Sequence, residues 1–203
     1  MKQLTGIMLV IIFSTGFAQT PAWFEEPTPP RLFLGGDAGL FRISHSDFKE
    51  FYTDRWGPSY SATAGVRVYS YYYATFSFGQ FNKDGKPNVY PTYTEEPAEP
   101  HWRENWYKIG VQMHPLRQEK WGSFYGFGFA LYHIDEKDPV RIYSSDRGQG
   151  FYMDIGADYK VHETATLYLK ISISSGGERD RSGFESRSIG GYRFALGLSV
   201  WPF

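Results

Sequence analysis

Eight runs of this sequence alternate between apolar residues and small or polar ones with a period of two. Between residues 165 and 175, for example, Leu167, Leu169 and Ile171 alternate with Thr166 and Tyr168. Because successive side chains of a strand point to opposite faces, such a run predicts a strand with one apolar face. We therefore expect strands at residues 31–43, 59–69, 73–81, 105–114, 123–133, 150–161, 165–175 and 189–200.

The connections between these runs are alternately long and short. The long ones are residues 44–58, 82–104, 134–149 and 176–188, and the short ones are residues 70–72, 115–122 and 162–164. If consecutive strands are antiparallel neighbours, all long loops lie at one end of the sheet and all short turns at the other. With an even number of strands, both termini lie at the short-turn end.

The small and polar face of the runs is rich in glycine, and this indicates which face is enclosed. Seven of the eight runs carry glycine there, namely Gly35, Gly65, Gly79, Gly110, Gly126, Gly156 and Gly197. Glycine weakens a solvent-exposed strand, whereas small residues make room for large ones inside a narrow barrel. We therefore predict that this face points inward and the aromatic and aliphatic face outward. Lipid tolerates such an exterior, and a closed barrel leaves no unpaired backbone in lipid.

The composition agrees with this class and excludes several others. Aromatic residues make up 19% of the chain, the mean hydropathy is −0.44 and there is no cysteine. The mature region has no apolar run of about 18 residues, which excludes a helical membrane protein. The net charge of −1 gives no reason to expect a nucleic-acid partner. The predicted fold class is all-β, an eight-stranded antiparallel up-and-down transmembrane β-barrel.

The first residues have the pattern of an export signal. Lys2 precedes an apolar stretch from Leu4 to Phe13, and the small residues Gly16 and Ala18 follow. This order of a positive charge, an apolar segment and small residues predicts a signal peptide over residues 1–18. The four prolines of residues 19–30 predict an extended periplasmic leader, and residues 31–203 are the expected barrel domain.

The signal peptide, the eight alternating runs, the one-sided long loops and the final Phe203 together resemble small outer-membrane β-barrel proteins. These are the proteins of the outer membrane protein A and outer membrane protein X type. The resemblance covers residues 31–203 and is architectural. It implies an integral protein of the cell envelope of a Gram-negative bacterium, a monomer surrounded by outer-membrane lipid. It also implies that the barrel-assembly machinery recognises the last strand.

The end of that last strand departs from the alternation. Phe203 is out of phase with Leu196, Leu198 and Val200, and Pro202 cannot donate a ladder hydrogen bond. Either a bulge resets the register at Trp201 or the strand ends at Val200. The sequence leaves both alternatives open.

Aromatic residues near the ends of the runs fit the two interfacial girdles of a membrane barrel. Tyr71, Tyr72, Trp121 and Trp201 are expected at the short-turn end, and Trp106 near the long-loop end.

The face assigned to the interior carries charges of both signs, which must pair or be hydrated. The expected lumen charge network comprises Asp37, Arg67, Lys108, Asp154, Asp158, Lys160, Lys170 and Arg193. The turn at 162–164 places Lys170 diagonal to Asp154 and Asp158, so we expect it to pair with one of them. A salt-bridged plug is the first interpretation, and a narrow ion path is the alternative.

No residue pattern specifies catalysis, a cofactor or a metal. The five histidines have no ligand-type spacing. Small outer-membrane barrels include acyltransferases and deacylases acting on lipid A, which use Ser, His and a carboxylate. The candidates for such residues here are the triplets at residues 45–47 (His-Ser-Asp) and 144–146 (Ser-Ser-Asp). The simpler interpretation of both triplets is that they are loop residues in contact with water.

The predicted long loops carry aromatic residues beyond what strand packing requires. They are Phe48, Phe51, Tyr52, Trp56, Tyr90, Tyr93 and Trp102. Exposed aromatic residues can mark a binding surface; alternatively, these side chains pack among themselves over the barrel mouth. The sequence thus predicts a structural or surface-interaction role, such as envelope integrity, adhesion or partner binding through the loops. A lipid-modifying enzyme is the runner-up, followed by a narrow channel.

Overall fold

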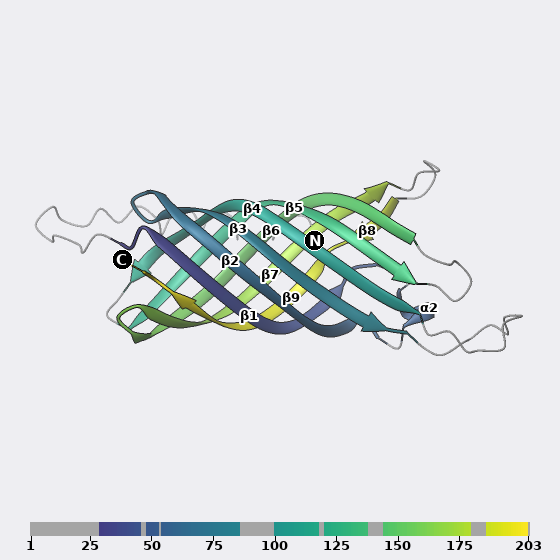
Figure 1. The fold of residues 1–203 in the computed structure, drawn as a ribbon, viewed down its shortest axis with the longest axis horizontal. Coiled ribbons are helices and arrows are strands. Elements are labelled where there is room, and N and C mark those ends of the chain that lie inside the picture. Colours follow the sequence, from purple (N-terminus) through teal and green to yellow (C-terminus); the bar gives the residue numbers. More distant parts are fainter. Residues whose placement is uncertain are drawn as a thin grey trace, which may run out of the picture.

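The chain forms a closed, tilted antiparallel barrel (Figure 1). The computed structural model describes residues 29–45, 48–52, 54–85, 100–117, 120–137, 144–179 and 186–202. The elements are β1 (Leu32–Ile43), α2 (Phe48–Phe51), β2 (Trp56–Tyr69), β3 (Tyr72–Asp84), β4 (His101–Arg117), β5 (Trp121–Lys137), β6 (Ser144–His162), β7 (Ala165–Arg179), β8 (Ser186–Ile189) and β9 (Gly191–Val200). The predicted fold class is confirmed: β1 to β7 pair in order, β8 and β9 both pair with β7 and share the eighth strand position, and β9 closes the barrel onto β1.

The register of the pairs fixes the tilt of the strands. Following paired residues once around the barrel from Leu32 of β1 leads back to β1 at Arg42, ten residues further along. The paired residues on the strands between these two positions are Val66, Ala74, Val111, Phe127, Met153, Ile173 and Tyr192. Eight strand positions with this stagger tilt by about 40° and enclose an interior that side chains just fill.

The outward face is apolar along the middle of the barrel. Phe127 is 67% exposed and Leu196 and Ile109 are each 59% exposed, as the alternation predicts for lipid-facing residues. The small face points inward, and large neighbours occupy the space that glycine leaves. A Cβ atom on Gly65 would lie 2.0 Å from the Phe33 ring. A closed ladder with this apolar exterior is the architecture of a membrane-spanning barrel.

Two tryptophans expected in the girdles lie inside the barrel instead. Trp106 and Trp201 are each 3% exposed, whereas Tyr72 and Trp121 do face outward. The reason is the strand period: Trp106 is two residues from the inward Lys108 and shares its face.

The last strand, β9, ends at Val200, which decides between the two alternatives for its register. The Trp201 amide then donates to the Thr164 carbonyl at 2.8 Å. The Trp201 indole N–H is 3.1 Å from both the Thr166 and Ser199 hydroxyls. Phe203, the expected signal peptide and most of the leader lie outside the described residues.

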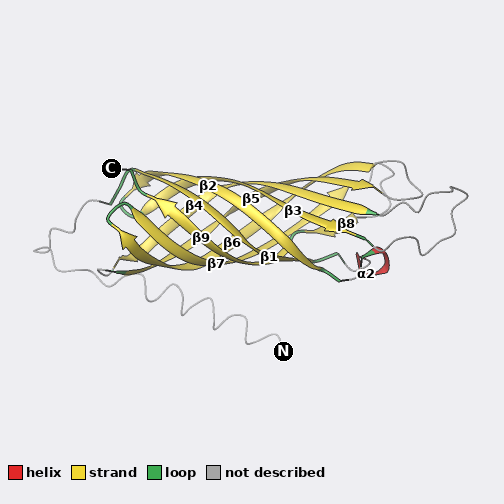
Figure 2. Ribbon diagram, turned by 60° about the horizontal axis from the view of Figure 1, so that its bottom comes forward, coloured by secondary structure: helices red, strands yellow, loops and turns green. Residues whose placement is uncertain are grey.

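The strands are longer than predicted, and most of the extra length is at the long-loop end. There β4 begins at His101, β5 continues to Lys137 and β6 begins at Ser144. Apolar alternation stops in these segments, but the backbone ladder continues with polar outward residues. Figure 2 shows α2 and β8 at this end, opposite the C-terminal end of β9. Gly190, with a φ of 84°, separates β8 from β9, a conformation that glycine adopts without strain. No helix among the described residues is long and apolar enough to span a membrane.

Candidate functional site

One buried carboxylate connects several strands in the middle of the barrel interior. Asp37 of β1 accepts a hydrogen bond from the Lys170 ammonium at 2.6 Å and forms an ion pair with Arg193. The Ser61 and Tyr168 hydroxyls donate to the same carboxylate at 2.7 and 2.8 Å. Two cations thus share one acid, and Asp37 joins strands β1, β2, β7 and β9.

A second ion pair lies beside this group. Lys108 of β4 is 3.5 Å from Asp154 of β6 and donates to the Ser172 hydroxyl at 2.7 Å. Ser172 in turn donates to Asp154. The Lys108 ammonium also lies over the Tyr152 ring, 4.7 Å from its centre. All four side chains are buried, so the middle of the lumen is occupied by paired charges and hydroxyls.

The structure gives Lys170 a different partner from the one expected. Its ion pair is with Asp37, not with Asp154 or Asp158. The hairpin between β6 and β7 places the two expected acids nearby in the ladder, but closure through β9 brings β1 close on the other side. Asp37 was among the expected network residues, yet a pairing across the closure is not visible in a local turn.

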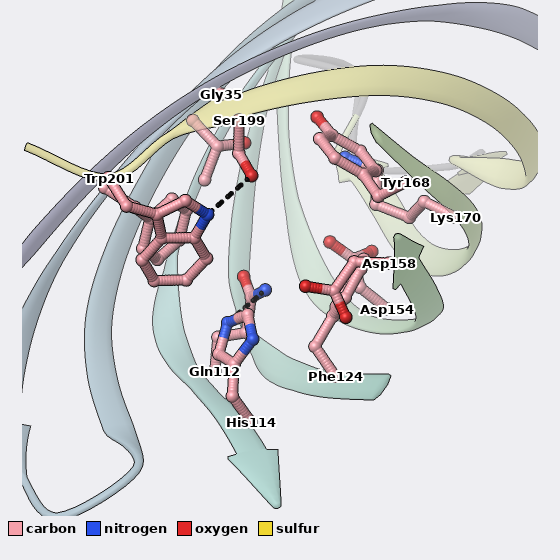
Figure 3. A pocket seen from close by; sticks show the side chains of 12 residues that line it. Gly35, Gln112, His114, Phe124, Asp154, Asp158, Tyr168, Lys170, Ser199 and Trp201 are labelled. Carbon is pink, nitrogen blue, oxygen red and sulfur yellow. Dashed lines mark hydrogen bonds between the residues drawn. The ribbon is translucent and has the colours of Figure 1, made fainter. Parts of the chain in front are cut away.

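The other expected network residues lie toward the short-turn end. Arg67 donates to the Pro29 carbonyl, and Lys160 is exposed. Asp158 is buried and lines a cavity of about 30 Å³ together with His114, Gln112 and Lys170 (Figure 3). That volume holds one or two water molecules. Closer to the short-turn end, a cluster of four rings packs edge to face and obstructs that end of the lumen. Its members are Phe33, Tyr73, His114 and Trp201.

An aromatic cap fills the opposite end, where the long loops emerge. Phe48 of α2 stacks on Tyr52 with ring centres 4.0 Å apart and meets Trp102 edge-on at 5.4 Å. Phe81 and Ile134 complete the cap, and all five side chains are buried. We call these five residues the mouth cap.

The loop aromatic residues singled out in the sequence therefore do not form one exposed surface. Phe48, Tyr52 and Trp102 pack over the mouth, which was the alternative interpretation. Trp56 is exposed on the outward face, 6.2 Å from the Phe194 ring. Tyr90, Tyr93 and the side chain of Phe51 lie outside what the structure describes.

An ion pair ties the segment after α2 to the barrel wall. Lys83 of β3 donates to the Asp54 carboxylate at 3.1 Å and to the Trp56 carbonyl at 2.8 Å. Slight burial opposes ionisation of Asp54, but the Lys83 hydrogen bond outweighs it and lowers the pKa of that carboxyl. Because Asp54 is half exposed, we expect this pair to hold the loop in place rather than to add much stability.

Neither serine-containing triplet forms a catalytic arrangement in the described residues. Ser145 and Asp146 are neighbours on β6 and point to opposite faces. His45 stacks on Trp102, and the two residues after it are not described. Among the described residues, no group of three or more His, Asp or Glu could hold a metal ion.

No protein-family model and no curated protein sequence matches this sequence. Solved structures do match it. Neisserial surface protein A, at 13% identity, has a TM-score of 0.62 over 84% of this chain and 97% of its own. OprG from Pseudomonas aeruginosa, at 11% identity, has a TM-score of 0.54 over 85% of this chain and 96% of its own. The fold is that of a small outer-membrane β-barrel. The attachment invasion locus protein Ail of Yersinia pestis, solved with the heparin analogue sucrose octasulfate, matches this barrel at 9% identity. Its TM-score is 0.51 over 84% of this chain and 99% of its own.

Proposed function

We propose that this outer-membrane barrel is a non-conducting anchor that holds a surface for partner binding outside the cell. The proposal rests on the observation that side chains close the lumen at three levels. The mouth cap fills the long-loop end, the ion pairs of Asp37 and Asp154 fill the middle, and the ring cluster around Trp201 obstructs the short-turn end.

A channel requires a continuous path of water, whereas the cavity lined by Asp158 and His114 has room for one or two molecules. Opening a wider path would separate buried charges from their partners, which is costly. The closed interior therefore favours a role on the outside of the barrel.

The long-loop end is where that role would be performed. Here β4, β5 and β6 continue past the apolar belt and carry polar residues on both faces. Rigid strand extensions that support loops are a common way of presenting a binding surface. A surface role of this kind also fits the similarity to Ail, an attachment invasion locus protein solved with a heparin analogue.

Enzymatic modification of lipid is the less supported alternative. It needs a nucleophile, a base and an orienting acid within hydrogen-bond reach of one another. In the 144–146 triplet, the described Ser145 and Asp146 side chains point to opposite faces of β6 and so do not meet.

Two measurements test the proposal. Purified protein in a planar bilayer should give no stepwise conductance. Cells expressing it should bind immobilised heparin or purified matrix glycoproteins more than a deletion strain does. Replacing residues 86–99 by a short Gly-Ser linker should reduce that binding, whereas the same linker at 118–119, at the other end, should not. Stepwise conductance in the parent protein, or equal binding by all strains, would overturn the proposal.

A further inference from the structure

Two arginines and a histidine lie on the outside of the barrel, just beyond the apolar belt. Arg103 of β4 and Arg147 of β6 are exposed, and the half-buried His133 of β5 lies between them. His133 is directly paired with Arg147 in the ladder, and Arg103 is paired with Asp135, two residues from His133. Paired and diagonal neighbours on one face are within reach of long side chains.

Arg103, His133 and Arg147 form a short arc at nearly one height along the barrel axis. With the observed stagger, and about 3.3 Å of rise per residue, their Cα atoms lie within about 3 Å of one level along the barrel axis. The nearest exposed apolar residues toward the membrane are Tyr107, Leu131 and Phe151, on the same three strands. They are two to four residues away, with Asn105 and Gln149 between them and the two arginines, so the arc lies just beyond the lipid-facing surface.

The arc has more positive charge than its neighbours neutralise. The one acid within it, Asp135, is 3.4 Å from His133 Nε2. In the described part of the chain, neither Arg103 nor Arg147 has an ion pair. Two residues further from the membrane on β4, His101 lies 2.6 Å from the Asp84 carboxylate. Lys137, the ladder partner of His101 on β5, is exposed and adds a positive charge.

We propose that Arg103, His133 and Arg147 form a binding site for the phosphate groups of the glycolipid in the outer leaflet. A guanidinium group binds phosphate through two parallel hydrogen bonds, and two of them flank this site. The long arginine side chains reach the headgroup level, while the lipid's acyl chains lie along the apolar belt below. Charge complementarity and the closeness of that belt favour a lipid over a soluble anion. This inference is independent of any partner bound by the loops.

Binding of lipid A to the purified, refolded barrel in detergent micelles tests this site. The test variant is Arg103→Gln/Arg147→Gln. The matched control is Arg31→Gln/Lys160→Gln, which removes two exposed positive charges at the short-turn end. Each cation near an anionic membrane surface contributes a factor of about five, so the test variant should bind diphosphorylated lipid A about 25-fold more weakly. The control should bind it as the parent does. Gel mobility of unheated samples verifies that each variant is folded.

Four outcomes would refute the site. The test variant could bind diphosphorylated lipid A as tightly as the parent, or the control could weaken as much as the test variant. Dephosphorylated lipid A could bind the parent equally well, which would leave only acyl-chain contact. Millimolar inorganic phosphate could displace the lipid, which would indicate a site for soluble anions.

Discussion

Replacing Asp37 should destabilise the barrel more than replacing either of the cations that it pairs with. Asp37 is 7% exposed and serves both Lys170 and Arg193, so Asp37→Leu leaves two buried cations without their acid. Breaking a buried pair from one side costs about 3–5 kcal/mol. In Lys170→Met, by contrast, Asp37 keeps Arg193 and the Ser61 hydroxyl. That variant loses one charge-assisted hydrogen bond, about 1.5–3 kcal/mol.

Urea unfolding of the refolded protein in detergent measures both free energies. Lys108→Met is the comparison within the second pair, where Asp154 would keep only the Ser172 hydroxyl and no direct ion pair. Its cost should therefore approach that of Asp37→Leu. The double variant Asp37→Leu/Lys170→Met should recover part of the loss, because one uncompensated cation is removed. If Lys170→Met proves as costly as Asp37→Leu, the view of Asp37 as the shared acid is wrong.

Three further predictions concern the exterior, the mouth and the export signal. Leu196→Arg, in the middle of the lipid-facing belt, should cost about 2–4 kcal/mol and impair assembly, whereas Val68→Arg at the edge should cost about 0–1 kcal/mol; equal costs would mean that the belt is misplaced. Trp102→Ala should loosen the mouth cap and speed tryptic cleavage after the exposed Lys49, and an unchanged rate would show that the cap does not hold α2. N-terminal sequencing of the protein from outer-membrane fractions should begin at Gln19; an intact Met1 would contradict the predicted signal peptide.

Much of the barrel is determined by local pattern. The period-two alternation predicted the strands and the inward and outward faces, because neither depends on which strands are neighbours. It also placed Asp37, Lys108, Asp154, Lys170 and Arg193 in the interior, where all five are buried. The alternation of long and short connections predicted the up-and-down topology, because a short turn can join two antiparallel strands only if they are neighbours in the sheet.

The ends of the strands were not predictable in the same way. The apolar signal stops where the lipid stops, but the hydrogen-bonded ladder does not. His101 and Lys137 therefore belong to strands that their polarity conceals. For the same reason, the sequence did not predict the arc of Arg103, His133 and Arg147. These residues are scattered in the sequence and become neighbours only through the register of β4, β5 and β6.

The sequence by itself determined the class of fold, the strands and the side of the wall on which most side chains lie. Only the tertiary structure decided which interior charges are partners, that the mouth aromatic residues are buried and that Trp201 plugs the lumen. The physical reason is closure. Joining β9 to both β1 and β7 brings Asp37 to Lys170, which are 133 positions apart in the chain. A pairing across that seam depends on the stagger accumulated around the barrel, and no local pattern records it.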